Sequence, residues 1–166
     1  SEVAKLRDIS IEKITAAREK FKKATVKFKK VDREVKEERK ALQETIKQVK
    51  DCEEDCDALE EEALAAAKRF VQKSGETILA HLGKIEEKIN GDESINAQRA
   101  ADALEKIAKA KAEVQQQMDL AASATTKEEI RKAAKNISSI WKRIKNVTKR
   151  QAVRIVNAHT GEIIRR

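Results

Sequence analysis

Residues 14–35, ITAAREKFKKATVKFKKVDREV, carry the pattern that decides the fold. Apolar residues recur there at alternating steps of three and four, a spacing that keeps one helix face toward a supercoiled partner. The pattern continues as far as Phe70, and neither glycine nor proline interrupts residues 2–73. The spacing therefore predicts one long coiled-coil helix over residues 1–73, about 105 Å long. The residues expected on its seam are Ile14, Phe21, Phe28, Val31, Val35, Leu42, Val49, Cys52, Cys56, Leu59 and Phe70.

The composition favours an all-α protein. Charged residues make up 40% of the 166 residues, aromatic residues make up 2%, and proline is absent. A wide globular core relies on aromatic rings, whereas long helices that meet along narrow seams need mainly Ala, Ile, Leu and Val. The rest of so short a chain cannot bury a seam as long as the one predicted. We therefore expect a partner, in the first place a second copy in an elongated dimer.

Shorter helices are expected over residues 74–150, folding back along the long helix. Ser74-Gly75 is the first credible break, and Asn90-Gly91-Asp92 is typical of a turn, with Gly91 after one helix and Asp92 as the next N-cap. A third helix is predicted over about 95–122.

A capping box, formed by Thr125 with Glu128 or by Thr126 with Glu129, predicts the start of a fourth helix. Strict three-four spacing gives that helix a second apolar face, which we expect to pack against the others. The residues on this face are Ile130, Ile137, Ile140, Trp141, Ile144 and Val147.

The C-terminal segment, residues 151–166, differs from the rest. Two short apolar runs flank Asn157-Ala-His-Thr-Gly161, which predicts a β-hairpin that docks on the helices or begins another domain. Residues 127–166 carry a net charge of +9, so an anionic partner is a hypothesis for this region. Its candidate contacts are Lys142, Arg143, Lys145, Lys149 and Arg150. Trp141 is the only aromatic residue near them, so base stacking would be poor and nucleic acid is the less favoured anionic partner.

The sequence offers no catalytic, cofactor or metal site. Cys52 and Cys56 lie one helical turn apart, but a structural zinc site needs four ligands and neither His81 nor His159 lies near them in sequence. We expect both cysteines to pack on the seam as thiols, in a cytoplasmic or nuclear protein. No nucleophile accompanies either histidine, and no apolar run is long enough to span a membrane. An enzyme is not expected.

The order of three segments resembles the coiled-coil region of tripartite-motif (RING, B-box, coiled-coil) proteins. These segments are SEVAKLRDISIEKI, GETILAHLGKIEEKI and AEVQQQMDLAASATTKEEIRKAAKNISSIWKRI. The resemblance implies an antiparallel homodimer of the long helix, with later helices folding back toward its centre. Family members are commonly ubiquitin ligases. This sequence lacks the cysteines and histidines of a RING or B-box, so ligase activity would need a RING outside it.

These features lead to two hypotheses. The first is a non-catalytic dimerisation and scaffold module that spaces flanking domains and binds protein partners. The second is a monomeric basic helical bundle that binds nucleic acid or lipid surfaces. The second requires residues 1–73 to bend back on themselves, and only Asp32 and Asp51-Cys52 are candidates for that bend.

Overall fold

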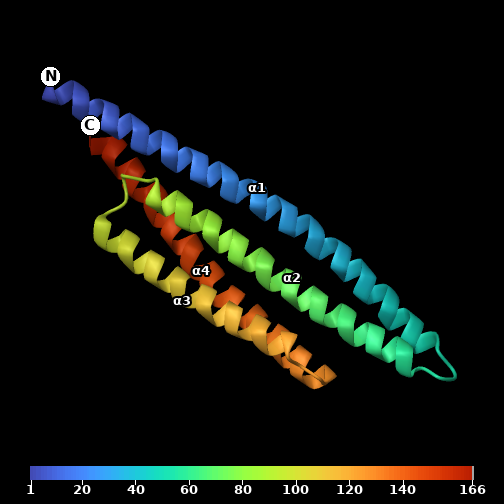
Figure 1. Ribbon diagram of the computed structural model, residues 1–166. Coiled ribbons are helices and arrows are strands. Elements are labelled where there is room, and N and C mark those ends of the chain that lie inside the picture. The colour runs from blue at the N-terminus through green and yellow to red at the C-terminus, as the bar shows by residue number, and fades with distance from the viewer. Residues whose placement is uncertain (166) are drawn as a thin grey trace.

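The computed structural model is an elongated bundle of four helices, each antiparallel to the helix before it (Figure 1). The helices are α1 (Glu2–Asp51), α2 (Asp57–Asn90), α3 (Ala97–Ala122) and α4 (Lys127–Arg165). The structure describes the backbone of residues 1–165 and the side chains of residues 1–146 other than Ile9. The all-α prediction is confirmed.

The first helix is shorter than predicted. Residues 1–73 do not form one helix, because α1 ends at Asp51 and the chain reverses direction before α2 begins. Cys52 is extended, with φ −77° and ψ 126°, and Asp55 adopts a left-handed φ of 52°. Aspartate tolerates that conformation better than most residues do. Residues 51–62 also hold eight carboxylates and no basic residue, and like charges one turn apart destabilise a continuous helix.

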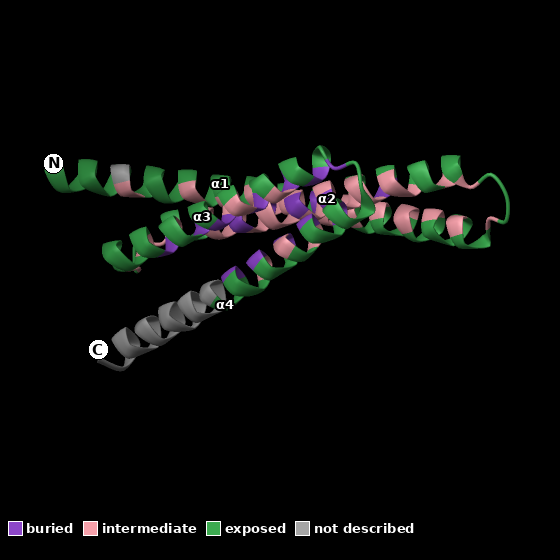
Figure 2. Ribbon diagram, turned by 90° about the horizontal axis from the view of Figure 1, so that it is seen from below, coloured by how far each residue is buried: buried purple, intermediate pink, exposed green. Residues whose placement is uncertain are grey.

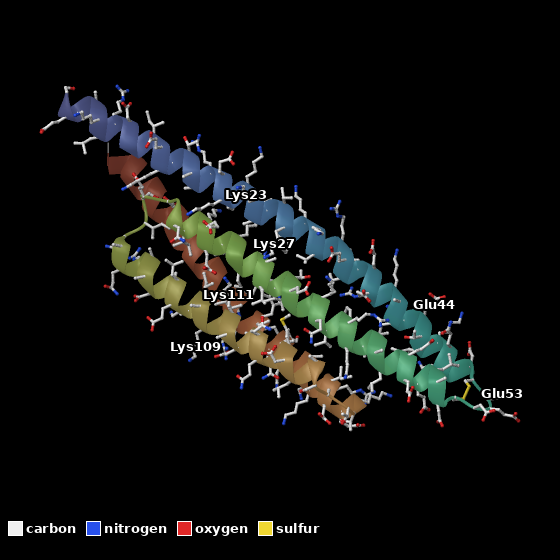
Figure 3. The ribbon with its side chains drawn as sticks, in the orientation of Figure 1. Lys23, Lys27, Glu44, Glu53, Lys109 and Lys111 are labelled. Atoms are coloured by element: carbon white, nitrogen blue, oxygen red, sulfur yellow. A yellow bond between two sulfur atoms is a disulfide. The ribbon has the colours of Figure 1, made fainter. Side chains whose placement is uncertain are left out.

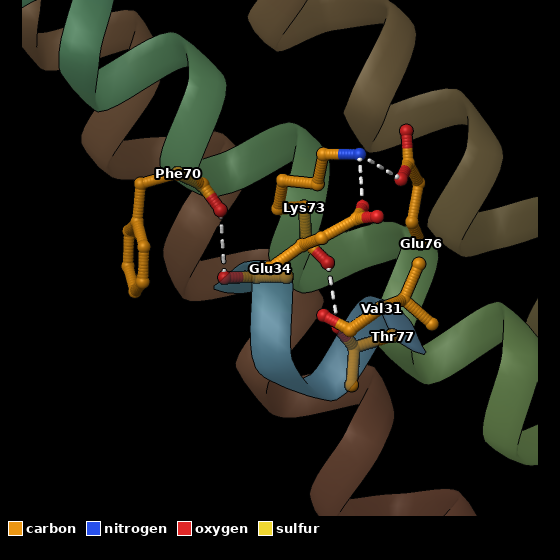
Figure 4. Close-up of polar contacts among 7 residues, drawn as sticks. Val31, Glu34, Phe70, Lys73, Glu76 and Thr77 are labelled. Atoms are coloured by element: carbon orange, nitrogen blue, oxygen red, sulfur yellow. Dashed lines mark hydrogen bonds and ion pairs between the residues drawn. The ribbon is translucent and has the colours of Figure 1, made fainter. Parts of the chain in front are cut away.

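The seam residues of α1 pack against α2 of the same chain. Each contact pair between the two helices is placed nearly symmetrically about residue 54. Thr77 Oγ1 donates to the carbonyl oxygen of Val31 at 3.4 Å (Figure 4). The rings of Phe28 and His81 lie 5.0 Å apart. The stripe predicted for a dimer is therefore the inside of an intramolecular helical hairpin.

The break predicted at Ser74-Gly75 is also absent, because α2 continues through it. The hydroxyl of Ser74 donates to the carbonyl oxygen of Phe70 at 2.8 Å, inside the helix. A Cβ on Gly75 would collide with the side chain of Met118 in α3. This glycine therefore lets α2 and α3 approach closely rather than ending a helix.

The main hydrophobic core joins α2, α3 and α4 (Figure 2). Leu82, Ile107 and Val114 are its largest fully buried side chains. The predicted apolar face of α4 is confirmed for the residues whose side chains are described: Ile130, Ile137, Ile140 and Ile144 are buried, and Trp141 packs beside them. Val147 lies outside the described side chains.

The predicted turns are mostly confirmed. Gly91 follows the last residue of α2, although the N-cap of α3 is Asn96 rather than Asp92. Thr126 Oγ1 accepts from the backbone N–H of Glu129 at 3.2 Å and donates to its carboxylate at 3.0 Å, which confirms this capping box. No strand occurs within residues 1–165, and α4 runs to Arg165, so the expected C-terminal β-hairpin is not found.

Candidate functional site

A groove of about 910 Å³ lies between α1 and α3 and has α2 as its floor. Ala80 and Gly83 of α2 share one helix face with Glu76 and Glu87, because these positions are three or four residues apart. Lysines of α1 form one wall, and α3 forms the other. The lining residues of the two walls are Lys20, Lys23, Ala24, Lys27 and Val31 on α1 and Lys111, Ala112 and Gln115 on α3.

The groove combines an apolar floor with a basic rim. Residues 18–30 hold seven basic residues and one acidic residue, and α1 presents three of the lysines to the groove. Figure 3 labels two of them, Lys23 and Lys27. Within the described residues, no ion pair joins Lys20, Lys23 or Lys27 to another side chain. The opposite wall is less positive, because Lys111 lies 2.5 Å from Glu86. The uncompensated charge is therefore on the α1 side.

Gly83 leaves the floor of this groove open. A Cβ built on Gly83 meets no atom within 4 Å, whereas one on Gly75 meets Met118 and one on Gly91 comes within 2.9 Å of the Ala17 side chain. A glycine inside a helix costs about 1 kcal/mol relative to alanine. Packing within this chain accounts for Gly75 and Gly91, but it does not account for Gly83.

A second exposed apolar surface lies at the start of α1, which extends past the end of α2 (Figures 1 and 2). Gly91, the residue after α2, lies against Ala17, so residues 2–16 project beyond the hairpin. We call residues 2–16 the α1 overhang. Val3, Leu6 and Ile11 are 76%, 67% and 55% exposed, and Ile14 is 38% exposed. Val3 and Ile14 keep the register of the stripe that packs on α2, and Leu6 and Ile11 flank it on either side. Among the described side chains, none from another helix covers these four residues.

Three aromatic rings connect α1, α2 and α4. The His81 ring lies 5.0 Å from Phe28 and 5.1 Å from Trp141, in tilted and edge-on arrangements. Its Nδ1 is buried without a hydrogen-bond partner. Burial lowers the pKa of His81, and the Lys84 ammonium lowers it further. Neither a nucleophile nor a carboxylate among the described side chains is bonded to His81, and its ring contacts are those of a packing residue.

The cysteines occupy the tip of the hairpin (Figure 3). Cys52 and Cys56 form a disulfide with a Cα–Cα distance of 5.9 Å, so the prediction of two thiols packed on a seam is wrong. Four residues of separation suit a turn that is cross-linked at its base. The cytoplasmic or nuclear location was predicted from cysteines that were expected to be free thiols, whereas disulfides persist mainly in oxidising compartments. The location stays a prediction.

Comparison of the chain with known proteins gave one result. No family model, curated protein or solved structure matches it. The resemblance to tripartite-motif proteins therefore stays a prediction.

The other predicted seam residues follow the register of the hairpin. Phe21 and Phe28 lie under the ammonium of Lys84, and Phe70 lies under the guanidinium of Arg39. The register places Leu59 opposite Val49. Val31 is buried, and the remaining α1 members Val35, Leu42 and Val49 are half-buried, whereas Ile14 is exposed in the α1 overhang.

The predicted anionic-partner residues do not form a common site in the described part of the chain. Lys142 and Arg143 are exposed, and Arg143 is paired with Glu113 of α3. Lys145 is exposed and has a partner of its own, and the side chains of Lys149 and Arg150 lie outside the described residues. Sequence reasoning missed the lysines of α1. Their signal was the run of basic residues at 18–30.

No three His, Cys, Asp or Glu side chains in the described part of the chain come together as a metal site would require. None of the helices there is both long enough and apolar enough to cross a bilayer.

Proposed function

We propose that the chain is a non-catalytic helical scaffold that joins two copies of itself through the α1 overhang. The observation that carries this proposal is the exposed stripe of Val3, Leu6, Ile11 and Ile14. Val3 and Ile14 continue the register of the α1–α2 seam, and Leu6 and Ile11 widen the exposed apolar surface on either side of it. Exposed apolar patches of this kind mark interaction sites. A second α1 overhang is the simplest surface with the same period.

The order of charges along the α1 overhang supports an antiparallel pair. Glu2 and Lys13 are eleven positions apart, so they lie at nearly the same angle around the helix, on one flank of the face that carries Val3 and Ile14. An antiparallel pairing centred near Asp8 brings Glu2 opposite Lys13 of the second copy. Such a two-fold interface is self-complementary, as the interfaces of most homodimers are.

This proposal keeps only part of the tripartite-motif hypothesis. The role that it keeps is that of joining two subunits and spacing the domains attached to them. The single long helix implied by the resemblance is not what α1 and α2 form. Dimerisation is thus proposed at one end of the hairpin and not along residues 1–73.

The alternative of a basic bundle that binds nucleic acid or lipid is not favoured. Its aromatic residue, Trp141, is half-buried against His81 and is not presented to bases. One of its cations, Arg143, is already paired with Glu113.

Light scattering over a concentration series tests the proposal. We expect the wild-type mass to approach that of a dimer and to fall on dilution, because the seam is only about four turns long. Leu6→Asp with Ile14→Asp should give a monomer, since two charges would be buried at the seam. Ile46→Asp is the matched control, because Ile46 is also exposed on α1 but lies outside the overhang.

A charge-reversal pair tests the orientation. Lys13→Glu should weaken the dimer, and adding Glu2→Lys should restore it, because the two positions then again carry opposite charges. A wild-type protein that stays monomeric at high concentration would contradict the proposal. So would a dimer that Leu6→Asp/Ile14→Asp leaves intact.

A further inference from the structure

We propose that the groove between α1, α2 and α3 binds an acidic amphipathic helix from a partner protein. This site is separate from the α1 overhang and does not rest on dimerisation. The inference begins with Gly83, whose missing side chain no contact within the described chain requires. A glycine at such a position allows another backbone to approach closely.

The shape of the groove suits a helix. Its α1 wall runs from Lys20 to Val31, a length of about 17 Å or three helical turns. Ala24, Ala80 and Ala112 surround Gly83 with small side chains, so the floor is shallow and apolar. A helix that lies there would be a third neighbour of α2 on this face, in the space between α1 and α3.

The charge of the groove selects the kind of helix. Lys20, Lys23 and Lys27 form a row along one wall without ion-pair partners among the described side chains. Two carboxylates also line the floor, Glu76, which is bonded to Lys73 at 3.0 Å, and Glu87. The lining still carries four lysines against these two glutamates, so its net charge is positive. A partner helix with Asp or Glu along the flank that faces α1 would complement this row, and one with Lys or Arg there would be repelled.

Nucleic acid fits this groove less well than a helix does. No aromatic side chain lines it, so bases would find no stacking surface. Phosphates alone would be attracted by the lysines but would leave the apolar floor uncovered. The combination of a basic rim with a small-residue floor favours a protein helix that has both an acidic and an apolar face.

The test uses the full chain and a designed, fluorescein-labelled helical peptide of about 16 residues, matched to the groove by helix rise. The peptide carries alanine and leucine on one face and glutamate on the flanks. Its control carries lysine in place of glutamate. Fluorescence anisotropy should show binding of the acidic peptide in the micromolar range and weaker binding at high salt. The basic peptide should bind at least tenfold more weakly.

Three variants locate the site. Gly83→Leu fills the floor and should weaken binding at least tenfold, while leaving the helical circular dichroism and the melting temperature at or above those of the wild type. Lys23→Glu with Lys27→Glu should weaken binding similarly. Lys109→Glu is the matched charge control, because Lys109 is exposed on α3 and does not line the groove (Figure 3).

The possible contrary results are distinct. Failure of the acidic peptide to bind with a Kd below about 1 mM would overturn the proposal. Equal affinity for Gly83→Leu and the wild type would also overturn it, since the groove floor would then not be the contact. If single-stranded RNA or anionic vesicles displaced the peptide equally from the wild type and from the Gly83→Leu variant, the lysines would be acting as a general anion-binding surface. The proposal would then also be wrong. Light scattering on the Gly83→Leu variant shows whether dimerisation is unchanged. The outcome of the peptide test can therefore be separated from the outcome of the dimer test at the α1 overhang.

Discussion

Lys73 of α2 donates from Nζ to the carboxylate of Glu34 in α1 at 2.7 Å, which ties together the two arms of the hairpin (Figure 4). The same ammonium lies 3.0 Å from Glu76, within its own helix. The hydrogen bond from Lys73 lowers the pKa of Glu34, and the bonds to Glu34 and Glu76 raise the pKa of Lys73. This cluster therefore favours the ionised forms of Glu34 and Lys73.

Glu34→Gln should lower the melting temperature at pH 7. The melting temperature of this variant should also fall less than that of the wild type between pH 7 and pH 3. Because the folded-state pKa of Glu34 is depressed below its ordinary value of 4.5, its contribution is present above that pH and is lost as the pH falls further. Thermal melts followed by circular dichroism between pH 7 and pH 3 measure this. Glu37→Gln is the control, because Glu37 is exposed on the same helix. Equal effects of both substitutions would show that the bond to Lys73 contributes nothing.

Acidification should also destabilise the protein through His81. Its pKa is lowered by burial, so the unfolded chain takes up a proton at higher pH than the folded chain does. The contribution of His81 to the free energy of unfolding should therefore be fully present above about pH 6.5 and should fall as the pH drops below that value. His81→Phe keeps a ring between Phe28 and Trp141 but cannot be protonated. Urea midpoints at pH 8 and pH 5 should differ less for this variant than for the wild type, and an unchanged difference would contradict the prediction.

The disulfide should add stability without determining the hairpin. In the chain-entropy model, closing so short a loop contributes about 2 kcal/mol, so Cys52→Ala with Cys56→Ala should lower the free energy of unfolding by about that amount. The arms should still meet, since the contacts of Lys73 and Thr77 with α1 do not involve the tip. A zero-length cross-link between Lys73 and Glu34, detected by mass spectrometry, should survive. If small-angle scattering instead showed the variant extending to about 130 Å, the length of one helix from Glu2 to Asn90, the disulfide would be what prevents one continuous helix.

Substituting two leucines by alanine should distinguish a core position from a surface position by the loss in unfolding free energy. Leu82 is fully buried among α2, α3 and α4, and Leu82→Ala should cost about 2–5 kcal/mol in unfolding free energy. Leu120 is 53% exposed on α3, and Leu120→Ala should change stability by no more than about 0.5 kcal/mol. Chemical denaturation measures both. A similar loss of unfolding free energy for the two variants would indicate that Leu120 is buried in an intermolecular interface, which the single chain does not contain.

Local and periodic signals were sufficient for several elements. The Thr126–Glu129 capping box, the turn at Gly91 and the buried face of α4 are each encoded within a few turns of chain. A side chain that bonds its own backbone, or a stripe that repeats with the helical period, does not depend on what lies elsewhere in the protein. The candidate groove lacked such a signal, because the lysines of α1 and Gly83 of α2 are far apart in sequence.

The heptad stripe by itself determined that α1 would be a helix with one face needing cover. It could not determine whether the cover belongs to a second copy or to the same chain, because both present the same spacing. Only the tertiary structure decided this, through the reversal between Asp51 and Asp57. Once the chain turns there, the second helix is held next to the first at a high effective concentration, so the intramolecular seam forms before an intermolecular one can. The sequence likewise showed a glycine at 75 and another at 83, and only the position of Met118 distinguished the packed one from the open one.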